Sequence, residues 1–284
     1  MLLLLSAVLC GVYVYALARG DVSLEIEHVK DITVTAHRGS SGEYPENTMP
    51  AFRAAAEAGA DYLELDVQQT RDGVLVVLHD ASLRRVAGVS RNIWEMTWDE
   101  ARLLDVGSSF SPVFAGTPIP TLDEVLAFAE EEHLRLNIEL KPTGHETELE
   151  QQVSELIHAH NMERRCVVTS QKYDTLQRLK KLDPELTTVY VMSVAYGRIT
   201  DLQYADEFSV RYNFVTQELV SSVHQAGKRI RVWTVNSQSV MDRMIRLDVD
   251  DLITDRPALA VERVARSRTS NLVDELTRRL LGTP

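Results

Sequence analysis

The sequence predicts an α/β fold: a TIM (β/α)8 barrel with a small inserted subdomain, preceded by an apolar N-terminal segment. From Asp31 onward, short runs rich in β-branched residues alternate with amphipathic helical stretches, as is typical of parallel βαβ units. About eight such units in about 250 residues match the size of a TIM barrel. The chain has 284 residues, 44% of them hydrophobic, so it can bury a core of that size.

The first element is an apolar leader without charged side chains, residues 1–18. As a helix it would be about 27 Å long, slightly shorter than the ~30 Å hydrocarbon core of a bilayer. We expect a membrane-embedded segment and a membrane-associated protein. Because Ala16 and Ala18 form an A-x-A-like end, the alternative is a signal peptide cleaved from a secreted protein, although no positive charge precedes the leucines. The last span of a larger membrane domain and a buried helix of a soluble protein stay open as further interpretations.

Nine segments have the composition of strands, one more than a barrel of this type holds. They are residues 32–36, 62–67, 74–78, 134–140, 166–170, 187–192, 207–210, 229–235 and 251–253. Only the turn around Arg71-Asp72-Gly73 separates the second segment from the third, which leaves no room for a helix. We therefore expect a hairpin-like excursion there and one accessory strand.

Helical patterns lie between these strands, at residues 48–58, 122–132, 147–160, 173–181, 216–226 and 240–247. Residues 81–120 break the alternation with two tryptophans, a short helical stretch near 98–104, and Gly and Pro residues. We expect them to form an inserted subdomain on one rim of a barrel that spans residues 31–260. A C-terminal helical tail should follow over residues 261–284, with a stripe formed by Val264, Leu272, Leu276 and Leu280.

Charged or titratable side chains recur near the carboxyl ends of the first four strands. They are His37 and Arg38, then Glu64 and Asp66, then His79, and then Glu139 and Lys141. Because residues i and i+2 of a strand face the same side, Glu64 projects with Asp66, and Glu139 with Lys141. The carboxyl ends of barrel strands form the usual catalytic mouth.

Three carboxylates that converge in an apolar barrel repel one another unless a positive charge lies between them. A divalent cation held by Glu64, Asp66 and Glu139 would supply that charge. Ligands that are all oxygen atoms favour Mg²⁺ or Ca²⁺ over zinc.

The two histidines titrate near neutral pH, so His37 and His79 can exchange protons with an attacking hydroxyl and a leaving alkoxide. Arg38 and Lys141 suit a phosphate group. Each feature alone has an ordinary structural explanation, but their recurrence at consecutive strand ends indicates metal-dependent cleavage of a phosphodiester.

The charge balance argues against a nucleic-acid partner. The chain has 30 Lys and Arg residues against 42 Asp and Glu residues, a net charge of −12, and no basic stripe. Binding to nucleic acid needs clustered cations. We expect a small-molecule anion instead, captured locally by a few cations or a metal.

Eight motifs in order along residues 31–260 resemble glycerophosphodiester phosphodiesterases. They are HRG-x5-PENT from His37, ELD from Glu64, RDG from Arg71, LHD from Leu78, IPTL from Ile119, IELK from Ile138, VWTVN from Val232 and ITDRP from Ile253. Any one fragment would be weak evidence, whereas the ordered set is specific.

The resemblance implies a TIM barrel of the PLC-like phosphodiesterase type and hydrolysis of glycerophosphodiesters to sn-glycerol 3-phosphate and an alcohol. It implies that His37 and His79 are the acid–base pair, and that a hydroxyl of the substrate attacks phosphorus to give a cyclic phosphate. The remaining implied roles are metal binding by Glu64, Asp66 and Glu139, phosphate contact by Arg38 and Lys141, and a pocket wall at Trp233. The apolar leader resembles the membrane-anchored branch of the family.

One departure from the family pattern follows His79-Asp80, where many relatives have a Thr-rich turn and this chain has Ser82-Leu83-Arg84-Arg85. It leaves the headgroup preference open. The alternative activities are a lysophospholipase D that acts on membrane lysolipids and an inactive binding protein with the same fold. In the PENT motif, Asn47 or Thr48 can cap the first helix, which is explanation enough for Glu46 as well.

Overall fold

The structure, a computed structural model, describes residues 32–194 and 197–281. Residues Ile32–Ser270 form one compact unit. The predicted membrane segment, residues 1–18, lies outside the described residues. None of the helices in the described part of the chain is long and apolar enough to cross a membrane.

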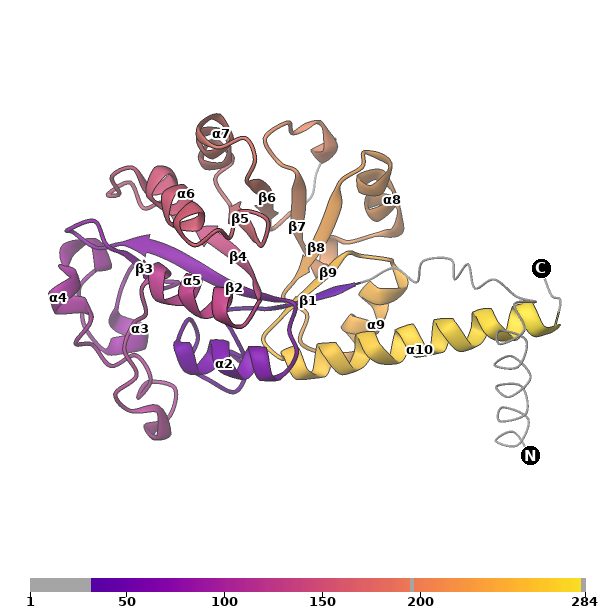
Figure 1. Cartoon of the computed structure of the whole chain (residues 1–284), viewed down its shortest axis with the longest axis horizontal. Coiled ribbons are helices and arrows are strands. Elements are labelled where there is room, and N and C mark those ends of the chain that lie inside the picture. Colours follow the sequence, from indigo (N-terminus) through magenta and orange to yellow (C-terminus); the bar gives the residue numbers. More distant parts are fainter. Residues whose placement is uncertain (1–31, 195–196, 282–284) are drawn as a thin grey trace. The chain divides into compact units, whose positions relative to one another are not determined.

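Eight parallel strands close into the predicted barrel (Figure 1), because β1 pairs with both β9 and β2. The barrel strands are β1 (Thr33–Ala36), β2 (Tyr62–Gln69), β4 (Arg135–Leu140), β5 (Cys166–Ser170), β6 (Thr187–Met192), β7 (Glu207–Arg211), β8 (Arg229–Trp233) and β9 (Asp251–Thr254). At the point of closure, Thr35 is in register with Tyr62 on one side and with Ile253 on the other. The TIM-barrel prediction is confirmed.

The third predicted strand, residues 74–78, is the accessory one. β3 (Leu75–Val77) pairs antiparallel with β2 through Val67 and Val77, and it lies outside the barrel order. The turn between them contains Gly73 at φ 88°, a left-handed backbone conformation that glycine adopts without strain. The predicted hairpin is therefore present.

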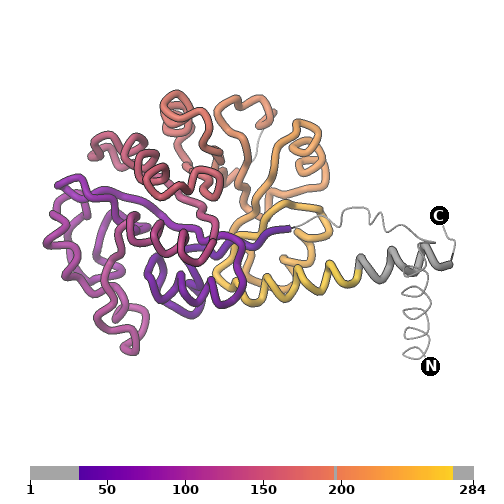
Figure 2. Tube along the Cα trace, in the orientation of Figure 1, coloured from indigo at the N-terminus to yellow at the C-terminus, as the bar shows by residue number. Residues whose placement is uncertain are grey.

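Helices surround the strands, and the chain runs once around the barrel (Figure 2). They are α2 (Met49–Glu57), α5 (Leu122–Glu131), α6 (Leu149–Ala159), α7 (Tyr173–Leu182), α8 (Gln217–Gln225), α9 (Gln238–Arg246) and α10 (Pro257–Leu281). All the predicted helical patterns became helices. Most bury one apolar face; α5, for example, begins with a capping box between Thr121 and Glu124 and buries Val125 and Leu126.

The predicted capping of α2 is wrong. Thr48 occupies the position before the helix, but its hydroxyl donates to the Pro45 carbonyl at 2.6 Å and makes no cap bond. Asn47 donates to Asp66 Oδ2 at 2.8 Å instead. A contact in the site thus takes the side chain that could have capped the helix.

The stretch predicted as an insertion contains only short helices and an apolar cluster separate from those of the barrel. The short helices are α3 (Arg84–Ala87), η1 (Ile93–Glu95), α4 (Trp98–Ala101) and η2 (Pro112–Phe114). Leu83, Ile93 and Ile119 lie in that cluster together with Val76 of β3. This cluster anchors the insertion on β3, next to the strand ends that carry the site.

At the C-terminus, α10 packs its first turns on the barrel through Ala260 and Val264. The side chains of Leu272, Leu276 and Leu280 lie outside the described residues, so the predicted stripe stays a prediction beyond Val264.

Candidate active site

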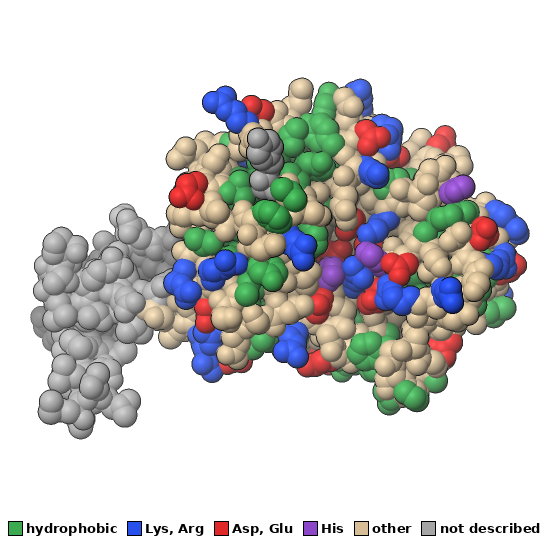
Figure 3. Space-filling view, turned by 180° about the vertical axis from the view of Figure 1, so that it is seen from behind, with side chains coloured by type: hydrophobic (Ala, Val, Ile, Leu, Met, Phe, Trp, Pro, Cys, Tyr) green, Lys and Arg blue, Asp and Glu red, His purple; other side chains and the backbone are tan. Residues whose placement is uncertain are grey.

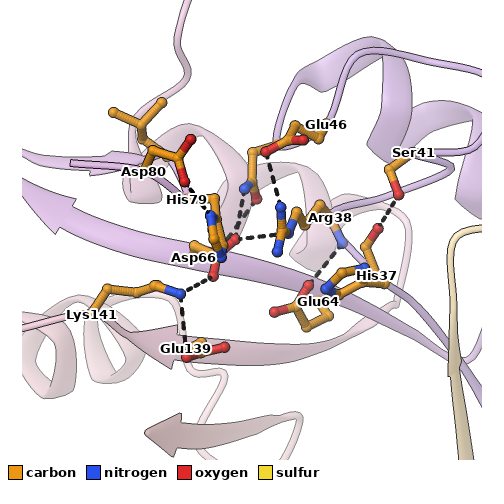
Figure 4. A network of polar contacts seen from close by, with 12 residues as sticks. His37, Arg38, Ser41, Glu46, Glu64, Asp66, His79, Asp80, Glu139 and Lys141 are labelled. Carbon is orange, nitrogen blue, oxygen red and sulfur yellow. Dashed lines mark hydrogen bonds and ion pairs between the residues drawn. The ribbon is translucent and has the colours of Figure 1, made fainter. Parts of the chain in front are cut away.

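The charged residues predicted from the strand ends meet at one mouth of the barrel. A cavity of about 100 Å³ opens there, lined by His37, Glu64, His79, Glu139 and Trp233 among others. Seen from the side opposite to Figure 1, acidic, basic and histidine side chains gather near the centre of the face (Figure 3). Figure 4 shows how these side chains point toward one another.

Three carboxylates form the acidic cluster of the mouth. Each of Glu64, Asp66 and Glu139 offers one oxygen, and these oxygens lie within 4.8 Å of one another. Asp66 is 1% exposed, and its Oδ1 atom accepts no hydrogen bond, although Lys141 Nζ lies 3.5 Å away. Three carboxylates that offer only oxygen ligands, one of them a buried oxygen without a hydrogen bond, fit a hard divalent cation such as Mg²⁺ or Ca²⁺.

The electrostatics of the cluster show the same need for positive charge. Burial, and next the negative charge of Asp66, raise the pKa of Glu64 to about 8, and the same two causes raise the pKa of Glu139. Burial opposes ionisation of Asp66 too, but Arg38 and Lys141 outweigh it and hold its pKa below the usual value. Crowded carboxylates that bind protons this readily are stabilised in the ionised form when a cation is bound.

A tight turn after β1 places the first basic residue. Arg38 has φ 56° and donates its backbone N–H to Glu64 Oε2 at 2.8 Å. Gly39 follows at φ 79°, and a Cβ there would lie 2.7 Å from the Ala51 carbonyl carbon. The HRG sequence therefore requires glycine at this turn.

The basic side chains lie against the carboxylates. Arg38 contacts Asp66 Oδ2 through Nε at 3.3 Å and donates from Nη1 to Glu46 Oε1 at 3.1 Å. Lys141 Nζ lies 3.5 Å from Asp66 and 3.5 Å from Glu139. The positively charged side chains of Arg38 and Lys141 thus border the acidic cluster, where they could contact the oxygens of a bound phosphate.

His37 is oriented by Asp255, which follows β9. Its Nδ1 atom lies 2.6 Å from Asp255 Oδ1, and the carboxylate is itself held by Asn236 Nδ2 at 2.5 Å and by the Ser41 hydroxyl at 3.1 Å. Burial by itself would lower the pKa of His37, but the charge of Glu64 and the hydrogen bond to Asp255 raise it overall.

His79 is oriented by its sequence neighbour. Its Nδ1 atom lies 2.7 Å from Asp80 Oδ1, and Gln68 Nε2 donates to the His79 carbonyl at 2.9 Å. Burial lowers the pKa of His79, and the opposing charge of Asp66 does not restore it. The two histidines therefore have pKa values shifted in opposite directions.

Trp233 forms part of the cavity wall, with Val191 and Ile253. Its indole N–H donates to the Ser209 carbonyl at 3.2 Å, which fixes the ring in the wall. A second cavity of about 230 Å³ shares His79 and Glu139 with the first and extends past Lys141. The mouth thus has space on two sides of the acidic cluster.

The supporting residues were missed in the sequence. Asp255 lies in the ITDRP motif and Asn236 in the VWTVN motif, but the sequence assigns neither a function. No local pattern places Asp255 beside His37, which is 218 positions away. The sequence suggests no role for Glu46 beyond the start of a helix, but in the structure its carboxylate forms ion pairs with Arg38 and Arg85. Asp80 alone among these residues could have been predicted as a supporting residue, because it directly follows His79 in the sequence.

The comparisons with known proteins agree with one another. Residues 37–259 match the model of the glycerophosphoryl diester phosphodiesterase family. A glycerophosphodiester phosphodiesterase of Caldanaerobacter subterraneus subsp. tengcongensis is 35% identical over 243 residues, which cover 82% of this chain and 98% of that protein.

One solved structure and one human enzyme extend the comparison. The structure of a phosphodiesterase of Oleispira antarctica, in complex with the product sn-glycerol-3-phosphate, has a TM-score of 0.77 at 28% identity and covers 82% of this chain and 96% of that one. A human lysophospholipase D is 34% identical over 161 residues, 55% of this chain and 50% of that protein.

Proposed function

This chain belongs to the glycerophosphoryl diester phosphodiesterase family, and from that premise we propose that it hydrolyses glycerophosphodiesters to sn-glycerol 3-phosphate and an alcohol by metal-dependent, two-histidine catalysis. The observation that carries the proposal is the position of His37 and His79 in one cavity with the cluster of Glu64, Asp66 and Glu139. Acid–base groups next to a cation site are what phosphodiester cleavage requires.

The metal would be Mg²⁺ or Ca²⁺, held by Glu64, Asp66 and Glu139. When bound, it supplies positive charge that stabilises the phosphoryl oxygens and acidifies a nearby hydroxyl. The buried Oδ1 atom of Asp66, which accepts no hydrogen bond, supports this assignment.

The histidines would divide the proton transfers. Each bonds a carboxylate through Nδ1, which leaves Nε2 as the nitrogen for exchange with the substrate. The lowered pKa of His79 favours its neutral form, which suits a base, and the raised pKa of His37 favours the protonated form, which suits an acid. His79 would thus accept the proton of the attacking substrate hydroxyl while His37 protonates the departing alcohol; the roles reverse when water opens the cyclic phosphate.

The remaining predicted residues would bind the substrate. Arg38 and Lys141 border the acidic cluster and would contact the phosphate oxygens. Trp233 would pack against the glycerol or alcohol group, since its ring lines the cavity.

A lysophospholipid is the second candidate substrate, and a groove on the rim favours it. This groove, of about 490 Å³, shares Gln171 and Val191 with the catalytic cavity and is lined further out by Tyr190, Met192 and Leu202. An alkyl chain could lie there while the headgroup phosphate occupies the mouth. The likeness to a human lysophospholipase D supports the same candidate.

A side-by-side assay of glycerophosphocholine and lysophosphatidylcholine tests the proposal. Both substrates release choline, but only the first yields sn-glycerol 3-phosphate. We expect faster turnover of glycerophosphocholine, with equal amounts of the two products. Turnover of the lysolipid alone would establish the second candidate, and choline release from neither would favour a binding protein with this fold.

A further inference from the structure

Arg85, in α3 of the insertion, contacts two carboxylates of the mouth. Its Nε donates to Asp80 Oδ2 at 2.6 Å, and its two terminal nitrogens donate to the two oxygens of Glu46 at 2.8 Å each. This is the fork geometry in which a guanidinium binds a carboxylate most strongly.

Each of these carboxylates also holds a residue of the site. Asp80 accepts from His79 Nδ1 through its other oxygen, at 2.7 Å, and Glu46 accepts from Arg38 at 3.1 Å. A continuous series of charge contacts therefore runs from His79 to Arg38, and Figure 4 shows Asp80 beside His79 and Glu46 beside Arg38. Arg85 is the connection between the two halves.

The full set of three contacts requires a guanidinium. Both Asp80 and Glu46 have pKa values below their usual range, where hydrogen bonds from Arg85 offset the cost of burial, so both are ionised and would repel each other without a cation between them. A lysine would keep the positive charge but lose the paired contact with both oxygens of Glu46.

Stability alone does not explain the arrangement. The Arg85 side chain is 49% exposed, and ion pairs as exposed as this one contribute little to folding. We therefore expect the contacts of Arg85 to affect how Asp80, Glu46 and their partners are oriented.

We propose that Arg85 is a positioning residue, which holds Asp80 and Glu46 and thereby sets the orientation of the His79 ring and of the Arg38 guanidinium. The inference rests on the proposed function, because proton exchange by His79 and phosphate contact by Arg38 give that orientation its consequence. It makes the insertion part of the catalytic apparatus, although no residue of the insertion needs to touch the substrate.

The test compares Arg85→Gln and Arg85→Lys with Arg84→Gln, a matched change on the same helix that lies outside the network. With glycerophosphocholine as substrate and metal in excess, we expect Arg85→Gln to lower kcat on the order of tenfold, as loss of an outer partner typically does, and to raise KM. Arg85→Lys should recover part of the loss, and Arg84→Gln should behave as the wild type.

Two further variants separate the contact through Asp80 to His79 from the contact through Glu46 to Arg38. They are Asp80→Asn and Glu46→Gln. Asp80→Asn should act mainly on kcat, through His79, and Glu46→Gln mainly on KM, through Arg38. Thermal unfolding is measured for every variant, because a purely structural role would lower Tm and leave kcat and KM of the folded protein unchanged.

Kinetic constants of Arg85→Gln within twofold of those of Arg84→Gln would overturn the inference. It would also be overturned if Asp80→Asn did not act mainly on kcat and Glu46→Gln mainly on KM. If Arg85→Gln does not fold, Arg85→Lys takes its place: it should still lower kcat relative to Arg84→Gln, and kinetic constants within twofold of those of Arg84→Gln would overturn the inference. His79→Ala serves as the reference: if it too is unimpaired, the proposed function fails, whereas impairment of His79→Ala alone refutes only the role of Arg85.

Discussion

At the scale of single residues, each histidine of the mouth is paired through Nδ1 with a carboxylate, Asp255 for His37 and Asp80 for His79. The pairing fixes the ring and leaves the same nitrogen, Nε2, for chemistry on both sides. Burial lowers the pKa of both rings. At His37 the charge of Glu64 and the hydrogen bond to Asp255 outweigh burial, whereas at His79 the charge of Asp66 does not, and Arg38 and Lys141 lower the pKa further. The proposed division into acid and base rests on these differences between the two rings.

Replacement of each histidine tests that division. His37→Ala and His79→Ala should each lower kcat on glycerophosphocholine by a factor of about 10²–10⁴, which is the usual contribution of general acid–base catalysis to the rate. With a glycerol phosphodiester whose leaving group is p-nitrophenol, His37→Ala should be largely rescued, since that group departs without a proton, and His79→Ala should not. Rescue of His79→Ala instead would reverse the assignment, and a loss below tenfold in both would refute the two-histidine mechanism.

The pH dependence of Asp255→Asn provides a second test at this scale. The acid must be protonated, so deprotonation of His37 should set the falling limb of kcat/KM above the ordinary pKa of 6.5. The Asp255 carboxylate raises the pKa of His37, and its neutralisation must lower it. A profile between about pH 5 and 9 should therefore show the falling limb moved to lower pH, with the rising limb in place. A limb that stays or moves upward would contradict the assignment.

At the scale of elements, the interior of the barrel beneath the mouth contains a buried ion cluster on β7, β8 and β9. Arg231 is fully buried, donates to Glu207 at 2.6 Å and lies 3.7 Å from Asp251, while Thr33 and Thr35 donate to Asp251. Its guanidinium also lies 4.6 Å from the centroid of the Tyr62 ring. The cluster ties these three strands to β1 and β2 at the point of barrel closure.

Removal of that cation should destabilise the barrel. Arg231→Met leaves Glu207 and Asp251 buried without their partner, and we expect a loss of about 3–5 kcal/mol in the free energy of unfolding, measured in urea. Arg229→Met is the matched control, because Arg229 is 40% exposed and 3.9 Å from Glu207, and it should cost under about 1 kcal/mol. Equal losses in the two variants would show that the buried cluster does not hold the strands together.

The elements were predictable because their signal is local. Alternating apolar patterns located the strands and the helices between the barrel strands, and the short spacing around Gly73 identified the hairpin of β2 and β3, whereas the helix α3 of the insertion was not predicted. Strand parity also placed Glu64 with Asp66 and Glu139 with Lys141. Contacts that depend on closure of the barrel were not predictable: Asp255 reaches His37 only because β9 pairs with β1, and Asn47 turned from its expected cap to Asp66 for the same kind of long-range reason.

At the scale of the whole molecule, we propose that the apolar leader, residues 1–18, anchors the protein in a membrane and so determines where the barrel works. The expressed full chain should then remain in the membrane pellet after carbonate extraction and keep its N-terminus. A soluble product that begins near Arg19 would show a cleaved signal and a secreted protein.

We propose that the barrel brings three carboxylates together to make a metal-dependent phosphodiesterase. The measurement that tests this proposal is turnover of glycerophosphocholine by the chelated protein, before and after addition of Mg²⁺ or Ca²⁺. We expect activity to disappear on chelation and to return with one of these ions, and Glu64→Gln, which removes a charge but little volume, to need more metal for the same recovery. Full activity after exhaustive chelation would show that turnover needs no metal at Glu64, Asp66 and Glu139.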